Sequence, residues 1–166
     1  MARRRPRTEL SKSTRENQER LVELLGASPD LTLRLVRIGP RGRIGVLLVA
    51  IAGLYDSAFV SEQVVAPIVA CGRRDGLTRT SAVSMIEGAL VTASEVRTVQ
   101  TLNEIIDEVL AGNTAVLVDG AERALIVSSA APPSRSVEEP DSEAIVRGPK
   151  VGFNEVLQTT SALIRQ

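Results

Sequence analysis

The sequence predicts an α/β fold, with α+β as the alternative, in which helices flank a mixed β-sheet with two hairpins. Segments of helical periodicity alternate along the chain with short apolar segments of strand length. Residues 31–38 and 43–52 form one pair of strand segments, joined by a short turn that contains two glycines. Residues 114–118 and 123–127 form a second pair, joined by a turn that begins with Asp119-Gly120. Each pair is typical of an antiparallel hairpin.

The composition allows a real hydrophobic core. The chain has 166 residues, of which 43% are hydrophobic and 24% charged, enough for one domain or two small ones. Only three aromatic residues occur, so the core must consist of Val, Ile, Leu and Ala. The longest apolar run, residues 44–54, has eleven residues. Because a transmembrane helix needs about 20, we interpret this run as a buried strand.

The first part of the chain is expected to hold a tail and one helix. Residues 1–12 are charged and lack periodicity, which predicts disorder, and no apolar stretch follows them as a secretory signal would require. Ser13 and Glu16 have the spacing of a capping box, and the leucines that follow predict a helix that ends near Gly26. Residues 31–38 alternate between polar and apolar, which indicates a half-buried strand.

Three further helices are expected before the second hairpin. Ser57 is placed to cap a helix over residues 58–70, which Pro67 should bend or end. Residues 80–90 predict a short helix, and residues 95–100 a strand. A second capping box opens a helix that Gly112 ends; its two residues are Thr101 and Glu104.

The domain organisation that follows has four parts. Residues 1–12 are a basic tail, 13–130 an α/β subdomain, 131–150 an extended linker, and 151–166 the start of a next helix. The last helix carries an apolar stripe that needs a partner surface.

Several classes of function are disfavoured by the sequence. There is no histidine, which removes serine–histidine and cysteine–histidine catalysis and imidazole metal sites. Cys71 is the one cysteine and cannot form an internal disulfide. Twenty basic residues balance twenty acidic ones, and the arginines among residues 3–7 lack interleaved aromatics, so a solvated tail is favoured over a nucleic-acid site. No phosphate-binding glycine motif is present. We therefore expect no catalytic activity, no cofactor and no metal.

Two aspartates each follow a hydrophobic strand and leave two interpretations open. Asp56, and Asp119 with Gly120, could form a ligand-binding corner at the strand ends. Alternatively, Asp119-Gly120 starts a tight turn, because glycine tolerates a positive φ.

The segment from Arg135 to Glu155 carries the most specific pattern, R-S-x-E-E-P-x-S-E-x-x-x-R-G-P-x-x-G-F-x-E. By composition it is a polar linker with two prolines. As a pattern it resembles the signature of the GerA family, the A subunits of spore germinant receptors. The positions expected to form an interaction surface are Arg135, Glu139, Pro140, Glu143, Arg147, Gly148, Pro149, Gly152, Phe153, Glu155 and, in the last helix, Arg165.

The resemblance extends over roughly residues 15–166. The other residues that show the resemblance are Asn17 in the leucine-rich helix, Asp30-x-x-x-Arg34, the strand end Gly53-Leu-Tyr-Asp56, and the stretch from Leu110 to Gly120. Thr160 stands where the family has asparagine, so an amide contact is not expected there.

The resemblance implies a specific setting. The chain would be the hydrophilic N-terminal part of a receptor A subunit, on the cytoplasmic side of the spore inner membrane, with membrane attachment through a later part. Its partners would be the receptor B and C subunits, with a homo-oligomer through the last helix also allowed. The first hypothesis is therefore a non-enzymatic interaction module that serves spore germination through subunit assembly and signal relay. The second is a stand-alone domain that binds a small, germinant-like molecule near Asp56 and Asp119.

Overall fold

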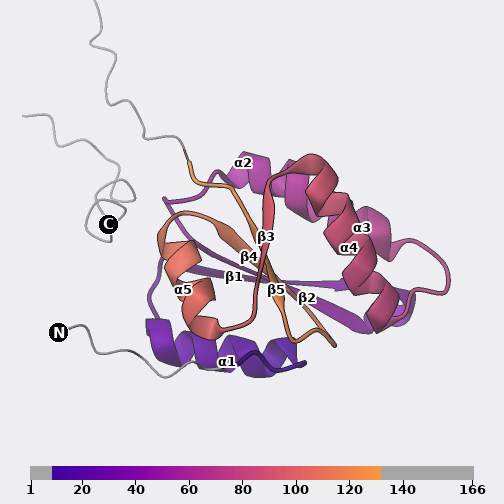
Figure 1. Ribbon diagram of the computed structural model, residues 1–166, viewed down its shortest axis with the longest axis horizontal. Helices are drawn as coiled ribbons and strands as arrows, with labels where there is room; N and C mark the ends of the chain where they lie inside the picture. The colour runs from indigo at the N-terminus through magenta and orange to yellow at the C-terminus, as the bar shows by residue number, and fades with distance from the viewer. Residues whose placement is uncertain (1–8, 132–166) are drawn as a thin grey trace, which may run out of the picture.

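A five-stranded sheet carries helices on both of its faces (Figure 1). The computed structural model describes residues 9–131. The helices are α1 (Thr14–Leu25), α2 (Ser57–Val60), α3 (Ala66–Gly72), α4 (Arg79–Ala93) and α5 (Leu102–Leu110), and the strands are β1 (Leu31–Ile38), β2 (Ile44–Ile51), β3 (Val96–Val99), β4 (Thr114–Val118) and β5 (Ala124–Val127). Within these residues, no helix is long and apolar enough to cross a membrane.

The strand order is β1-β2-β4-β5-β3, and every neighbouring pair is antiparallel. The predicted arrangement of helices flanking a sheet with two hairpins is confirmed, and of the two classes expected, α+β describes it. The expected mixed sheet is wrong, because no neighbouring pair among the described strands is parallel. The reason lies in the second hairpin. Helix α5 connects β3 to β4, which run parallel, and β5 then turns back into the space between them. Each adjacent pair is therefore antiparallel, although helices and strands alternate in the sequence.

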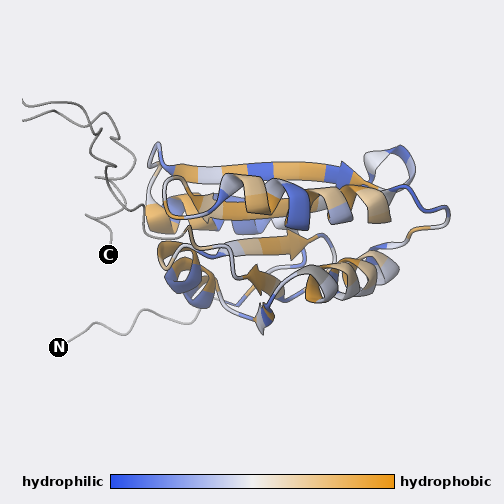
Figure 2. Cartoon of the chain, turned by 90° about the horizontal axis from the view of Figure 1, so that it is seen from above, coloured by the Kyte–Doolittle hydropathy of each residue, from blue (hydrophilic) through white to orange (hydrophobic). Residues whose placement is uncertain are grey.

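Each face of the sheet has its own hydrophobic core. Helices α2, α3 and α4 cover one face, and α1 and α5 cover the other (Figure 1). Successive side chains of β2 point to opposite faces, so Val46 and Leu48 enter the first core while Leu47 and Val49 enter the second. All residues of β2, β4 and β5 are buried, which is why these strands are almost continuously apolar (Figure 2).

Strand β1 is an edge strand and, unlike β2, β4 and β5, is only partly buried. It pairs with β2 along its whole length, from Leu31–Ile51 to Ile38–Ile44, and its other side has no strand. Arg34, Leu35 and Arg37 are exposed on it, so the prediction of a half-buried strand over residues 31–38 is confirmed.

The fold begins before Ser13, so the prediction of disorder is wrong for residues 9–12. Glu9 forms an antiparallel bridge with Thr101, and Leu10 is buried in the core under α1 and α5. Asn17, itself buried, holds this segment: its amide oxygen accepts from Ser11 N–H at 2.9 Å and its amide nitrogen donates to Ser11 C=O at 2.6 Å. A lack of periodicity could not reveal contacts that a polar side chain makes with the backbone.

The helix that follows β2 differs from the prediction in its N-cap and in its response to Pro67. Asp56, rather than Ser57, is the N-cap, because its carboxylate accepts from Phe59 N–H at 3.0 Å. Between α2 and α3, residues Ser61–Val65 form a π-helical segment, and Pro67 lies in the first turn of α3. Pro67 has no N–H to donate to the preceding turn, and the wider π-helical turn accommodates this missing hydrogen bond. The helix therefore continues to Gly72 and is not ended by Pro67.

The predicted first residues of the remaining helices, α4 and α5, are close to those observed. Helix α5 has the expected capping box: the Thr101 hydroxyl accepts from Glu104 N–H, and the Glu104 carboxylate accepts from Thr101 N–H. Thr78 and Ser81 form a capping box that starts helix α4 at Arg79, one residue before the predicted start, and the helix continues to Ala93, three residues beyond the predicted end.

Candidate functional site

The family-type motif lies outside the described residues. Arg135, Glu139, Pro140, Glu143, Arg147, Gly148, Pro149, Gly152, Phe153, Glu155 and Arg165 are all beyond residue 131. The same holds for the predicted linker and last helix. The structure shows instead where the described residues end before this segment, and which surfaces lie beside that point.

Three segments meet where the described residues end, and we call their meeting point the chain exit: residues 53–56, 112–114 and 128–131. Asp56 N–H donates to Ser129 C=O at 2.8 Å, and Ala131 N–H donates to Leu54 C=O at 2.9 Å. The buried hydroxyls of Thr114 and Ser129 lie 2.7 Å apart and hydrogen-bond to each other. The stretches Gly53–Asp56 and Gly112–Thr114, which carry part of the family resemblance, thus anchor the start of the motif-bearing segment.

Gly112 allows these segments to come so close. Its φ is 94°, a left-handed conformation that glycine adopts readily. A Cβ atom there would lie 2.7 Å from the carbonyl oxygen of Leu54 and 3.1 Å from Ala130 Cβ. Only a residue without a side chain fits.

Asp119 fastens the start of helix α1 to the sheet. Its Oδ1 accepts from Thr14 N–H at 3.0 Å and from the Thr14 hydroxyl at 2.7 Å, and its Oδ2 accepts from Gly45 N–H at 3.0 Å. A carboxylate is favourable at this place because helix N-termini carry a partial positive charge. Gly120 follows with a φ of 94° and donates its N–H to Lys12 C=O at 2.8 Å, as a turn glycine does.

The electrostatics of Asp119 agree with this structural role. Burial raises the pKa of its carboxyl group, but the hydrogen bonds from Thr14 and Gly45 and the positive charge of Arg79 outweigh burial and hold the pKa below its ordinary value. Asp119 is therefore ionised in the fold and engaged with three donors.

The two aspartates do not share a site. Asp119 follows β4 and lies beside Gly45 at the start of β2, whereas Asp56 follows the end of β2. Since β2 and β4 run antiparallel, the two carboxylates sit at opposite ends of the sheet, separated by roughly 20 Å of strand. A pocket formed by both, as the second hypothesis required, is excluded by this topology.

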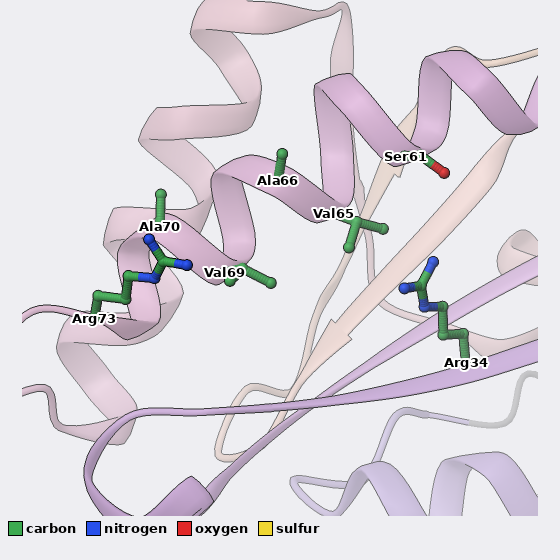
Figure 3. Close-up of a pocket in the computed structure, with 7 residues that line it drawn as sticks. All are labelled: Arg34, Ser61, Val65, Ala66, Val69, Ala70 and Arg73. Carbon is green, nitrogen blue, oxygen red and sulfur yellow. The ribbon is translucent and has the colours of Figure 1, made fainter.

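A groove lies between the edge strand and the helix that crosses it; we call it the α3–β1 groove (Figure 3). Its volume is about 450 Å³. Its lining residues are Arg34, Ser61, Val65, Ala66, Val69, Ala70 and Arg73. Arg34 extends from β1 below the part of the helix between Ser61 and Val65, and Arg73 lies next to Ala70 at the other end (Figure 3). The groove thus has apolar sides and one guanidinium toward each end.

This groove is adjacent to the chain exit. Tyr55, which forms an antiparallel bridge with Ala130, lines a small cavity of about 60 Å³ together with Arg34, Ser57 and Ser61. The groove and the exit therefore lie on the same side of the molecule.

Sequence reasoning missed the groove for an identifiable reason. In the sequence Arg34 is visible only as part of a family-type stretch, and Arg73 belongs to no motif. Their proximity depends on helix α3 packing across β1, which is recorded by the hydrogen bond from Gly39 N–H to Gly72 C=O at 3.3 Å. Gly72 is required there, because a Cβ would lie 2.6 Å from Ile38 Cβ. Over residues 9–131, no group of three or more potential metal-ligating side chains occurs.

The comparison with solved structures shows which known fold this chain shares. The fold matches the crystal structure of the N-terminal domain of the A subunit of the Bacillus megaterium spore germinant receptor GerK3, with a TM-score of 0.71 and 23% sequence identity, over 97% of this chain and 56% of that chain. The architecture is therefore that of a germinant-receptor N-terminal domain.

A family model described as Bacillus/Clostridium GerA spore germination protein matches residues 19–166. The chain belongs to this family. Among its relatives, spore germination protein KA of Bacillus subtilis (strain 168) is 28% identical over 157 residues, 95% of this chain and 28% of the relative. Spore germination protein GerLA of Bacillus cereus is 32% identical over 159 residues, 95% of this chain and 31% of the relative. The chain thus spans less than a third of the length of these relatives.

Proposed function

We propose that the chain is the N-terminal part of a spore germinant receptor A subunit and contributes to germination through subunit assembly and signal relay. In this proposal it is not an enzyme, and its partners are the receptor B and C subunits. It works on the cytoplasmic side of the spore inner membrane, to which a later part of the protein is attached. Self-association through the last helix belongs to the same proposal.

One observation carries the proposal: the family match runs through the whole motif-bearing segment, residues 135–155, and not only through the folded core. Packing of a core would not by itself require polar residues such as Glu139, Glu143 and Arg147. Arg147 is followed by Gly148 and Pro149, which favour a fixed, extended presentation of one guanidinium.

The chain exit supports the same proposal. Hydrogen bonds from Asp56 and Ala131 and the close approach at Gly112 hold the start of the segment against the sheet. A change at the motif would therefore be transmitted to a rigid point of the fold. A small-molecule site at Asp56 and Asp119 is not proposed, because both carboxylates accept backbone hydrogen bonds and lie at opposite sheet ends.

Replacing Arg147 with alanine in the full-length receptor is expected to slow nutrient-triggered germination by roughly 10–100-fold. The reason is the loss of charge-assisted hydrogen bonds to a partner, which contribute about 1.5–3 kcal/mol. Germination is followed as the fall in optical density of spores, and receptor abundance by immunoblot. A reduced receptor level would locate the defect in assembly, and an unchanged level in signal relay.

Lys150→Ala is the matched control, because it removes a neighbouring positive charge at a position where the motif accepts any residue. This variant should germinate normally. Normal germination of Arg147→Ala spores at normal receptor abundance would contradict the proposal.

A further inference from the structure

The two arginines of the α3–β1 groove have no acidic partner within the described part of the chain. Arg34 and Arg73 are exposed and form no hydrogen bond or ion pair with residues 9–131. Four other described arginines are paired with carboxylates, Arg15, Arg20, Arg97 and Arg123, whereas Arg37, Arg41, Arg43 and Arg74 form no ion pair among residues 9–131. Arg34 and Arg73 differ from these in lining the same groove. Between the two free guanidiniums lie Val69, which is 36% exposed, and two exposed alanines.

The groove is therefore suited to an extended segment with acidic side chains and small or apolar residues. The chain itself supplies one. Residues 138–143, Glu-Glu-Pro-Asp-Ser-Glu, hold four carboxylates and no positive charge. We propose that this acidic run docks in the α3–β1 groove of its own chain, with its carboxylates on Arg34 and Arg73.

The length of the connecting chain permits this docking. The last described residue, Ala131, is hydrogen-bonded to Leu54, and the neighbouring Tyr55 lines one small cavity with Arg34. Six residues lie between Ala131 and Glu138, and an extended chain spans up to about 23 Å over these seven Cα–Cα steps. The run can therefore reach the Arg34 end of the groove without displacing any element of the fold.

The spacing of charges also agrees. From Val65, beside Arg34, to Arg73 the helical path rises by roughly 12 Å at about 1.5 Å per residue. In an extended peptide, side chains four residues apart lie on one face and are separated by roughly 13 Å. Glu139 and Glu143 have this spacing, so both can face the two guanidiniums at once. Pro140, between them, is compatible with an extended backbone.

The test is intramolecular cross-linking in the 166-residue chain. Cys71 is changed to alanine so that only engineered thiols remain, and Ala66→Cys in the groove is combined with Ser142→Cys in the acidic run. A short bismaleimide is added at low protein concentration.

The control pair keeps Ser142→Cys and places the second cysteine at Asp107→Cys instead of Ala66→Cys. Position 107 is exposed on α5, on the opposite face of the sheet. We expect intramolecular cross-linking at least tenfold faster for the groove pair than for the control pair. Circular dichroism confirms that each variant is folded.

Charge reversal sharpens the test. Arg34→Glu with Arg73→Glu should lower the cross-linking rate of the groove pair to that of the control pair, and adding Glu139→Arg with Glu143→Arg should restore it. Equal rates for the two pairs in the unreversed chain would overturn the proposal. Cross-linked dimers in place of monomers would also overturn it, since the occupant would then be a second copy. Cross-linking that charge reversal leaves unchanged would show that the carboxylates do not direct the docking.

The proposal concerns the isolated chain and does not rest on the proposed function. Loss of germination in the Arg147→Ala receptor and loss of cross-linking in the isolated chain are measured separately, so either can fail alone. If both experiments give the expected result, Glu139 and Glu143 are held in the groove of their own chain until a partner protein binds the motif.

Discussion

Replacing Gly112 with alanine is expected to destabilise the fold by about 2–5 kcal/mol. Two effects add. A φ of 94° costs an alanine about 1–2 kcal/mol, and the new Cβ would lie 2.7 Å from the Leu54 carbonyl oxygen, which forces a shift typical of overpacking, about 1–3 kcal/mol. Since a domain has only about 5–15 kcal/mol of stability, the loss is large. Thermal unfolding followed by circular dichroism should show a Tm lower by roughly 10 °C or more.

Gly88→Ala provides the control for this experiment. Gly88 lies within α4, and a Cβ there would meet nothing within 4 Å. Alanine in a helix interior is favoured over glycine, so this variant should be slightly more stable, by up to about 1 kcal/mol. If Gly112→Ala unfolded at the same temperature as Gly88→Ala, the close packing at the chain exit would be disproved.

The second large effect is expected for Asp119→Asn, at about 2–3 kcal/mol. The carboxylate accepts three hydrogen bonds, from Thr14 N–H, the Thr14 hydroxyl and Gly45 N–H. An asparagine has one acceptor oxygen, and its NH₂ group would face one of these donors. A donor left without an acceptor costs about 1–3 kcal/mol, and more where the lost bond was charge-assisted. Urea unfolding measures the change, and Asp107→Asn, exposed on α5, should alter stability by less than about 0.5 kcal/mol.

The same variant should change how stability depends on pH. The pKa of Asp119 is lower in the fold than its ordinary value, because hydrogen bonds and Arg79 outweigh burial. The ionised group therefore contributes stability above the unfolded-state pKa of about 3.9, and this contribution is lost as the pH falls through the lower, folded pKa. Unfolding midpoints measured from pH 7 to pH 2 should fall less steeply for Asp119→Asn than for the parent chain. Parallel curves would show that Asp119 does not contribute to the acid sensitivity.

Local features of the fold could be predicted from the sequence. The strand over residues 31–38 and the capping box of α5 were expected with the bounds that the structure gives, because both depend on neighbouring residues. The buried central strand followed from the apolar run of residues 44–54, which is too short for a transmembrane helix.

Non-local features could not be predicted in the same way. The antiparallel order requires β5 to enter between β3 and β4, and no local pattern specifies this insertion. Asp119 meets donors that lie 105 and 74 residues earlier in the sequence, so its turn position was visible but its role was not. Arg34 and Arg73 come together only after α3 has packed on β1. The motif residues from Arg135 to Arg165 were recognised by family resemblance, and their contacts stay a prediction.

The position of β2 has a consequence for the newly made chain during translation. Strand β2 pairs with β1, which is made just before it, and also with β4, which is made much later. Its Leu47 and Val49 face a core that α1 covers in part and that is complete only when α5, β4 and β5 have been made. Residues 52–127 take roughly 4–15 s to synthesise at about 5–20 residues per second. For that time the β1–β2 hairpin is incompletely covered, and we expect its apolar face to be open to chaperones and to other nascent chains.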